Sequence, residues 1–400
     1  MISTETSKTT LDVHPNSMEN DPHHTPKPKN LTRYRFFLTG FGFAILLILP
    51  GLDQWFSFSS DFQSTEKHIL APFPTFKFPH VNTYISQFNQ YYKENFGWRN
   101  ALFYQYSHLK YDVLGVSPLP YKVILGKNNW FYPGNDLNNV ADQHQGLQPI
   151  ELQTLQTIVQ KLTAKQRKLA AQGIKFYLFI PPDSYTIYPE NLPDYLQNNR
   201  VISNYDRLKQ YLLKNTTIPL IDVRPALLAA KSRHQTYMQT DTHWNDYGAF
   251  IATLSLANRI RQDFPDMPLP KENDYSICAK KGYSGDLVTM MALNRDISDT
   301  VNYQIDAPPY LQVKEAGRIH NTELGGWPSQ RFVSMNKKSP SLLFIGDSFT
   351  ISLAQFVPNY FFKSYLVRSN LISDELVFSE KPDVVIFEIV ERNLAYLALL

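Results

Sequence analysis

The stretch that decides the fold of this chain is Ser341-Leu342-Leu343-Phe344-Ile345-Gly346-Asp347-Ser348-Phe349-Thr350. Its first five residues are mostly apolar and predict a buried strand. Gly346-Asp347-Ser348 is a turn tripeptide, and the residues after it can begin a helix. This order predicts that the Ser348 hydroxyl is exposed at the carboxyl end of a sheet. Backbone N–H groups at such a turn point toward the group that the hydroxyl attacks.

A second stretch, Gln239-Thr240-Asp241-Thr242-His243-Trp244-Asn245, lies about a hundred residues earlier. A serine nucleophile needs a base, and the base needs an orienting acid. In an extended segment positions i and i+2 share a face, so Asp241 can accept from one imidazole nitrogen of His243 while the other faces Ser348. The alternative is that His243 is a structural residue placed before a helix. Trp244 is expected in the core rather than as a sugar platform, and Asp347 is expected to bond nearby backbone N–H groups.

The composition indicates a globular chain with a sizeable core, since 43% of its 400 residues are apolar. The net charge of +3 comes from scattered residues, so nucleic acid is not an expected partner. The single cysteine, Cys278, excludes an intrachain disulfide and has no histidine or turn signature beside it. No set of His, Cys and carboxylates has metal-ligand spacing, and no Gly-rich loop could cradle a phosphate. The sequence therefore predicts neither a metal nor a cofactor.

Near the N-terminus, residues 36–52 carry no charge, at the short end of the about 17–25 residues that span a membrane. Basic residues precede this run and acidic residues follow it, which favours a cytoplasmic N-terminus. We expect a disordered cytoplasmic tail at 1–30 and an uncleaved transmembrane anchor at 31–55. A cleaved signal peptide and a buried helix of a soluble protein are the alternatives.

Further along the chain, predicted helices alternate with apolar strands, which is typical of a mostly parallel sheet with helices on both faces. We expect a helical lead-in at 56–120 and an α/β catalytic domain at 121–400, with an irregular insertion around 266–340. Expected within them are helices at 149–172 and 203–214, a helix capped by Asn245, a hairpin at 121–132, and strands at 174–180, 218–223 and 383–390.

These motifs together resemble the alginate O-acetyltransferase AlgJ/AlgX-type branch of the SGNH hydrolase-like superfamily. The resemblance runs from about residue 85 to 394 and rests on motifs in the family's order: Phe96-Gly97-Trp98-Arg99, Gly126-Lys127-Asn128-Asn129-Trp130-Phe131, Tyr188-Pro189-Glu190, Asp241-Thr242-His243-Trp244, Gly346-Asp347-Ser348-Phe349 and Glu391-Arg392-Asn393-Leu394.

The resemblance implies an SGNH three-layer α/β/α sandwich, circularly permuted because the acid and histidine precede the serine. It implies Ser348 as nucleophile, His243 as general base and Asp241 as orienting acid. It also implies an O-acetyltransferase at the periplasmic face of the bacterial inner membrane. Acetyl groups would come from a membrane-bound O-acyltransferase and pass to hydroxyls of an exopolysaccharide or cell-surface polysaccharide through an acetyl-serine.

Two other functions stay open at this stage: an acetylesterase that uses the same triad, and a non-catalytic sugar-binding subunit of a polysaccharide export complex. The oxyanion hole is expected to include the N–H of Ser348. Arg368, Tyr283 and Arg392 are candidates for its other donors. The alternative for Arg392, and for Glu391 beside it, is a buried structural ion pair.

Overall fold

The computed structural model describes residues 30–62, 70–197, 201–311, 313–320 and 328–400. The described residues of 1–59 and 71–99 form one compact unit, and those of 60–70 and 100–400 form a second. The predicted tail lies almost wholly outside the described residues.

The strands, in chain order, are β1 Val123–Leu125, β2 Phe131–Pro133, β3 Lys175–Ile180, β4 Leu220–Asp222, β5 Ser276–Lys280, β6 Asn302–Asp306, β7 Val313–His320, β8 Pro328–Ser334, β9 Leu342–Gly346, β10 Lys363–Arg368 and β11 Val384–Glu388. The α-helices are α1 Asn30–Phe56, α2 Val81–Asn95, α3 Arg99–His108, α4 Val140–His144, α5 Leu152–Ala170, α6 Ser184–Ile187, α7 Asn204–Asn215, α8 Arg224–Ala230, α9 Asp246–Arg261, α10 Asp286–Met290, α11 Thr350–Leu353 and α12 Asp374–Glu380. Shorter helical turns are η1 Leu109–Val113, η2 Pro189–Asn191, η3 Asp194–Leu196, η4 Glu272–Asp274, η6 Val357–Tyr360 and η7 Glu391–Leu399.

The second unit is built on a seven-stranded sheet with the order β4-β3-β11-β9-β10-β8-β7. The first five strands of this order run parallel, and β8 and β7 add an antiparallel edge. The stretch around β9 therefore lies in the interior of the sheet, as the unbroken burial of all its residues requires. The structure confirms the predicted mostly parallel α/β sheet.

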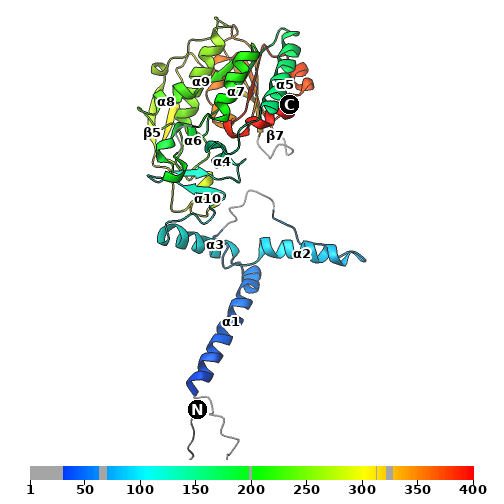
Figure 1. The fold of residues 1–400 in the computed structure, drawn as a ribbon, viewed down its shortest axis with the longest axis vertical. Helices are drawn as coiled ribbons and strands as arrows, with labels where there is room; N and C mark the ends of the chain where they lie inside the picture. Colours follow the sequence, from blue (N-terminus) through cyan, green and yellow to red (C-terminus); the bar gives the residue numbers. More distant parts are fainter. Residues whose placement is uncertain (1–29, 63–69, 198–200, 312, 321–327) are drawn as a thin grey trace, which may run out of the picture. The chain divides into compact units, whose positions relative to one another are not determined.

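Helices cover both faces of this sheet, which makes three layers (Figure 1). On one face, Leu342 and Phe344 of β9 join a core that includes α8, α9 and α11. On the other face, Leu343 and Ile345 pack with α5, α7, α12 and η7. The period of two along a strand explains this split, since successive side chains point to opposite faces.

Most predicted elements of this unit lie where the sequence placed them. β3, β4, β11, α5 and α7 match the expected strands and helices within a few residues, and β1 pairs with β2 as a hairpin. The region 266–340 differs in part from the expected loops and short strands. Its strands β5 and β6 pair antiparallel in a separate two-stranded sheet, but β8 pairs with β10 and so continues the main sheet. The antiparallel edge depends on this long-range pairing, which no local pattern shows.

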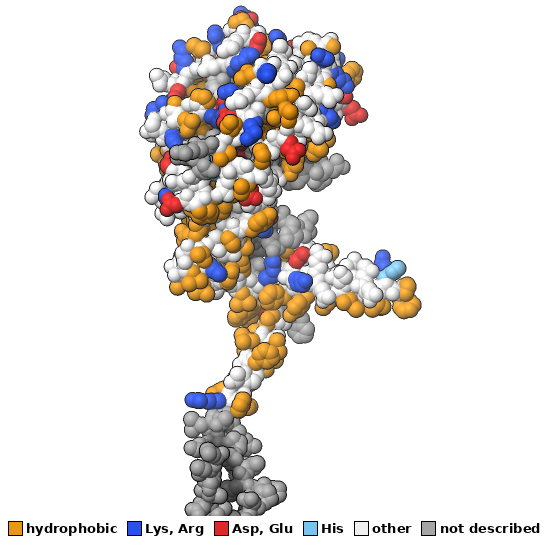
Figure 2. Space-filling model, in the orientation of Figure 1, with side chains coloured by type: hydrophobic (Ala, Val, Ile, Leu, Met, Phe, Trp, Pro, Cys, Tyr) orange, Lys and Arg blue, Asp and Glu red, His pale blue; other side chains and the backbone are white. Residues whose placement is uncertain are grey.

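In the first unit, α1 contains a stretch long and apolar enough to cross a membrane. This stretch, Tyr34–Asp53, has 20 residues and a mean hydropathy of 1.9, and little of it is buried within the protein. Hydrophobic side chains accordingly cover much of α1 in Figure 2.

Candidate active site

Ser348 lies two residues after the end of β9, where the chain turns toward α11. Gly346 lets this turn form, because a Cβ at this position would lie 2.1 Å from Oε2 of Glu388 on the neighbouring strand β11. Asp347 then fixes the turn: its carboxylate accepts the N–H of Phe349 at 3.0 Å and the N–H of Val390 at 2.9 Å. The prediction that Asp347 bonds backbone N–H groups is confirmed.

His243 reaches Ser348 from a loop between two residues that form an isolated bridge, Tyr237 and Trp244. Nε2 of His243 lies 2.8 Å from Oγ of Ser348, and Nδ1 lies 2.6 Å from Oδ1 of Asp241. The three side chains that the sequence singled out thus form one hydrogen-bonded chain, although His243 and Ser348 are 105 residues apart along the sequence.

The local geometry of Asp241 differs from the expected one. The segment bends at residues 241–243 rather than running extended. Oδ1 of Asp241 accepts the backbone N–H of His243 at 3.0 Å as well as the ring nitrogen. An Asp side chain commonly bonds the backbone two residues on, and here that turn brings the carboxylate to the imidazole. The hydrogen bond between Asp241 and His243 was predicted correctly, but the predicted extended backbone is wrong.

Asp286, at the start of α10, supports this arrangement and was missed from the sequence. Its N–H donates to Oδ2 of Asp241 at 2.8 Å, and its carboxylate accepts both the N–H and the hydroxyl of Thr242 at 2.9 Å each. Burial raises the pKa of Asp241, but the hydrogen bond and charge of His243 and the Asp286 N–H outweigh burial and leave this pKa below its ordinary value. The sequence signal was Gly285-Asp286, a turn followed by a short helix.

Asp241, His243 and Asp286 also bring potential metal-ligand atoms within 4.8 Å of one another. These atoms are already hydrogen-bonded: Nδ1 of His243 to Asp241, and both carboxylate oxygens of Asp286 to Thr242. This bonding fits an acid–base chain better than a cation site, which would need those same lone pairs.

The Ser348 hydroxyl borders a pocket of about 480 Å³ whose wall includes Arg368, Arg392, Asn138 and Asn393. Of the three candidate donors, Arg368 and Arg392 line this pocket, whereas Tyr283 does not. Tyr283 is half exposed, and burial followed by the charge of Asp241 raises its pKa. Burial lowers the pKa of the Arg368 guanidinium. The pocket can hold a polar ligand beside the hydroxyl.

Arg392 is a buried residue that forms an ion pair with Asp183, not with Glu391. Oε2 of Glu391 instead accepts the N–H of Asp183 at 3.0 Å and the hydroxyl of Thr186 at 2.6 Å. Burial, and then the charge of Asp183, raises the pKa of Glu391 to about 7. Both residues are therefore structural, as expected, although each has a different partner from the one the sequence suggested.

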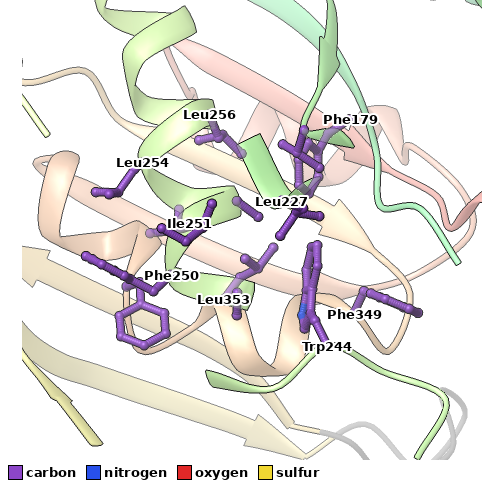
Figure 3. Close-up of a cluster of buried hydrophobic side chains, with 14 of the residues drawn as sticks. Phe179, Leu227, Trp244, Phe250, Ile251, Leu254, Leu256, Phe349 and Leu353 are labelled. Atoms are coloured by element: carbon purple, nitrogen blue, oxygen red, sulfur yellow. The ribbon is translucent and has the colours of Figure 1, made fainter. Parts of the chain in front are cut away.

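Aromatic packing holds the loop that carries His243 against the turn that carries Ser348 (Figure 3). Trp244 is 1% exposed, its ring meets that of Phe349 edge to face at 5.0 Å, and its Nε1 donates to Oγ of Ser352 at 3.0 Å. Phe349 also contacts the His243 ring, at 4.9 Å between centroids. Trp244 is a core residue, as predicted, and it sets the position of His243.

The chain matches one protein-family model and several curated relatives. Residues 123–372 match the family model for an SGNH hydrolase-like domain, acetyltransferase AlgX. A protein from Pseudomonas syringae pv. tomato named probable alginate O-acetylase AlgJ is 28% identical over 206 residues, which cover 51% of this chain and 49% of that protein. The protein of the same name from Azotobacter vinelandii is 24% identical over 210 residues, 52% of this chain and 50% of that protein. The chain thus spans about half the length of the curated relatives it matches.

Among solved structures, a DHHW family protein from Eubacterium siraeum matches with a TM-score of 0.50 and 14% identity, over 69% of this chain and 97% of that one. This likeness concerns the fold. The family match covers β1 through β10, and with them Asp241, His243 and Ser348. Because it takes in well over half of the 400 residues, the chain belongs to the AlgJ/AlgX-like family of SGNH hydrolase-like proteins.

Proposed function

We propose that this protein is a membrane-anchored O-acetyltransferase that moves acetyl groups onto hydroxyls of an exopolysaccharide or cell-surface polysaccharide, through an acetyl-serine at Ser348. The observation that carries the proposal is the Ser348–His243–Asp241 chain at the carboxyl end of β9, with spacings of 2.8 and 2.6 Å. The family match and the relatives named alginate O-acetylase support the acetyl group and the polysaccharide.

In the first half-reaction, Nε2 of His243 accepts the Oγ proton while Oγ attacks the carbonyl carbon of the acetyl donor. The carbonyl oxygen becomes an oxyanion, which the N–H of Ser348 stabilises. That N–H donates to no acceptor within the described part of the chain. One such preorganised donor lowers the barrier by about 3–4 kcal/mol. The tetrahedral intermediate then collapses, the donor oxygen leaves with the proton from His243, and acetyl-Ser348 remains.

In the second half-reaction, a sugar hydroxyl enters the pocket beside Ser348. Nε2 of His243 takes its proton while the sugar oxygen attacks the acetyl carbon, and the collapse returns the proton to Oγ. Asp241 keeps Nδ1 protonated and stabilises the imidazolium in both steps. Arg368, Arg392, Asn138 and Asn393 line this pocket, so the incoming sugar would meet both positive and amide side chains there.

The protein's location is part of the same proposal. α1 serves as a single-pass anchor in the bacterial inner membrane, with the catalytic unit, residues 121–400, in the periplasm and 56–120 as its lead-in. The length and hydropathy of Tyr34–Asp53, together with basic residues before it and acidic residues after it, support this orientation. A membrane-bound O-acyltransferase is the partner that would deliver acetyl groups across the bilayer.

The test uses the full-length protein in detergent with a chromogenic acetyl ester, with and without oligosaccharide acceptors that include oligoalginate. We expect Ser348-dependent release with acetyl recovered on the sugar, and an acetyl adduct on Ser348 when the acceptor is left out. Ser348→Ala should abolish both, whereas Ser379→Ala, an exposed serine on α12, should change neither. Ser348-dependent release to water alone, with every acceptor, would identify an esterase. A folded protein that gives neither acetyl release nor an adduct would instead be a non-catalytic sugar-binding subunit.

A further inference from the structure

Helix α2 carries an apolar face that the described residues of its own unit leave largely exposed. Over its 15 residues none is buried. Val81, Ile85, Phe88 and Tyr92 recur at helical spacing and are 41%, 50%, 38% and 52% exposed. The opposite face is polar, and Figure 2 shows hydrophobic side chains gathered along one side of this helix.

The segment before α2 enlarges this apolar face. The ring of Phe73 meets those of Phe88 and Tyr91 at 6.0 and 5.2 Å, and the ring of Phe76 meets that of Tyr84 at 5.3 Å. Phe73 and Phe76 themselves remain 60% and 58% exposed. Hydrogen bonds between Ala71 and the Glu94 and Asn95 side chains at the end of α2 hold the segment in place. The result is an exposed aromatic layer rather than scattered surface residues.

The end of α2 is joined directly to the end of the candidate membrane span. Asp53, the last residue of that span, accepts the N–H of Trp98 at 2.8 Å and the N–H of Ser59 at 2.7 Å. The backbone at Gly97 lies so close to α1 that a Cβ there would be 2.1 Å from the carbonyl oxygen of Pro50. The turn after α2 is therefore held where α1 leaves the apolar region.

We propose that α2 lies along the membrane surface, with its aromatic face in the lipid headgroup and acyl-chain boundary of the leaflet where α1 ends. This inference rests on the membrane anchoring proposed above. If α1 crosses the membrane, the hydrogen bonds that Asp53 accepts from Ser59 and Trp98 keep the C-terminus of α2 near the membrane surface. The distance is within one helix diameter, ~10 Å. A helix with one apolar face and interfacial aromatics binds in that zone.

The favoured partner is the lipid itself rather than a protein. The bilayer is present beside α2 wherever α1 is inserted, whereas a partner protein is not. α2 carries only one basic and one acidic side chain, Lys93 and Glu94. Its binding should therefore depend on apolar burial and be the same in zwitterionic and in anionic lipid.

The test places spin labels on full-length protein reconstituted in phosphatidylethanolamine–phosphatidylglycerol vesicles, after Cys278→Ser removes the chain's one cysteine. Single cysteines are introduced by Ile85→Cys on the apolar face, Ser86→Cys on the polar face and Leu46→Cys within α1. Collision rates with dissolved oxygen, which partitions into lipid, and with a water-soluble nickel chelate report depth. We expect oxygen to exceed nickel at positions 46 and 85 and the ratio to invert at position 86.

Each other outcome overturns the inference in a distinguishable way. If oxygen collisions dominate at position 46 but nickel collisions dominate at both 85 and 86, α1 is a membrane anchor and α2 does not lie on the membrane. If nickel collisions dominate at position 46, both the anchor and the surface helix are refuted. Shielding of position 85 from both reagents only after a membrane-bound acyltransferase is added would assign the apolar face to that protein instead of lipid.

Discussion

The buried carboxyl group of Glu388, which contacts the turn that carries Ser348, gives the most specific prediction. Glu388 is 1% exposed at the end of β11, and its Oε2 accepts the N–H of Asp347 at 2.7 Å. Its Oε1 has no hydrogen-bond partner among the described residues. Burial, and then the negative charge of Asp347, raises the pKa of Glu388 well above its ordinary value. We consider the substitution Glu388→Gln, which keeps the shape and the carbonyl acceptor but cannot ionise.

The sign of the effect follows from proton linkage. The unfolded carboxyl has a pKa of about 4.3. Between that value and the raised folded pKa, the folded protein binds the proton that the unfolded chain has lost, so stability falls as pH rises. The slope for one such group is about 1.4 kcal/mol per pH unit. Above roughly pH 5 the wild type loses stability with rising pH through this group, and Glu388→Gln does not. The free energy of unfolding of the variant, relative to that of the wild type, should therefore rise by about 1.4 kcal/mol per pH unit up to the raised pKa.

The assay is urea unfolding of the full-length protein in detergent at several pH values between 5 and 7, followed by tryptophan fluorescence. Glu391 adds a slope of the same sign, because its pKa is also raised, but it is present in both proteins and cancels in the difference. Glu375→Gln, at an exposed position on α12, controls for the loss of a carboxylate. A difference between Glu388→Gln and wild type that stays constant over this range would show that Glu388 is ionised in the fold, and would refute the reasoning.

Three further substitutions test the site and its support. Asp241→Asn should lower acetyl turnover on the order of 10⁴-fold with unchanged circular dichroism, because the imidazole loses its orienting acid; a loss below tenfold would contradict the assigned role. Gly346→Ala should destabilise the protein by about 1–3 kcal/mol and lower turnover, since its Cβ meets the Glu388 carboxyl; an unchanged melting temperature would count against the close approach. Asp183→Ala should cost about 3–5 kcal/mol in urea unfolding, because Arg392 stays buried without its carboxylate; a cost below about 1 kcal/mol would mean that Arg392 finds another partner.

Much of the fold could be predicted because its signals are local. Five apolar residues before Gly346 identified β9, and the amphipathic pattern of α5 and the cap at Asn245 fixed two helices; the Asn245 side chain accepts the N–H of Gly248 at 2.9 Å. The antiparallel edge was not predictable in the same way. β8 joins the sheet only by pairing with β10, and that pairing depends on strands far apart in the sequence.

The candidate site likewise contains residues that the sequence predicts and residues that only the structure identifies. Residue types and spacing suggested Ser348, His243 and Asp241, and their roles remain predictions until turnover is measured. The contributions of Asp286 and Glu388 escaped notice, because Gly285-Asp286 is a common turn pair and Glu388 carries no motif. Asp286 acts through its own N–H, and Glu388 accepts the N–H of Asp347. The partner of Arg392 was misassigned for the same reason: adjacent residues suggested a pair, whereas Asp183 lies 209 residues away along the chain.

The sequence by itself determined the layered α/β class, the apolar N-terminal helix and the three candidate residues, since periodicity, turn chemistry and residue type are properties of short stretches. Tertiary structure decided which groups meet. It set β9 in the interior of the sheet, brought His243 within 2.8 Å of Ser348, buried Glu388 under the turn and turned the Asp286 N–H toward Asp241. The physical reason is that hydrogen bonding and desolvation act over a few ångströms in space, whatever the separation along the chain.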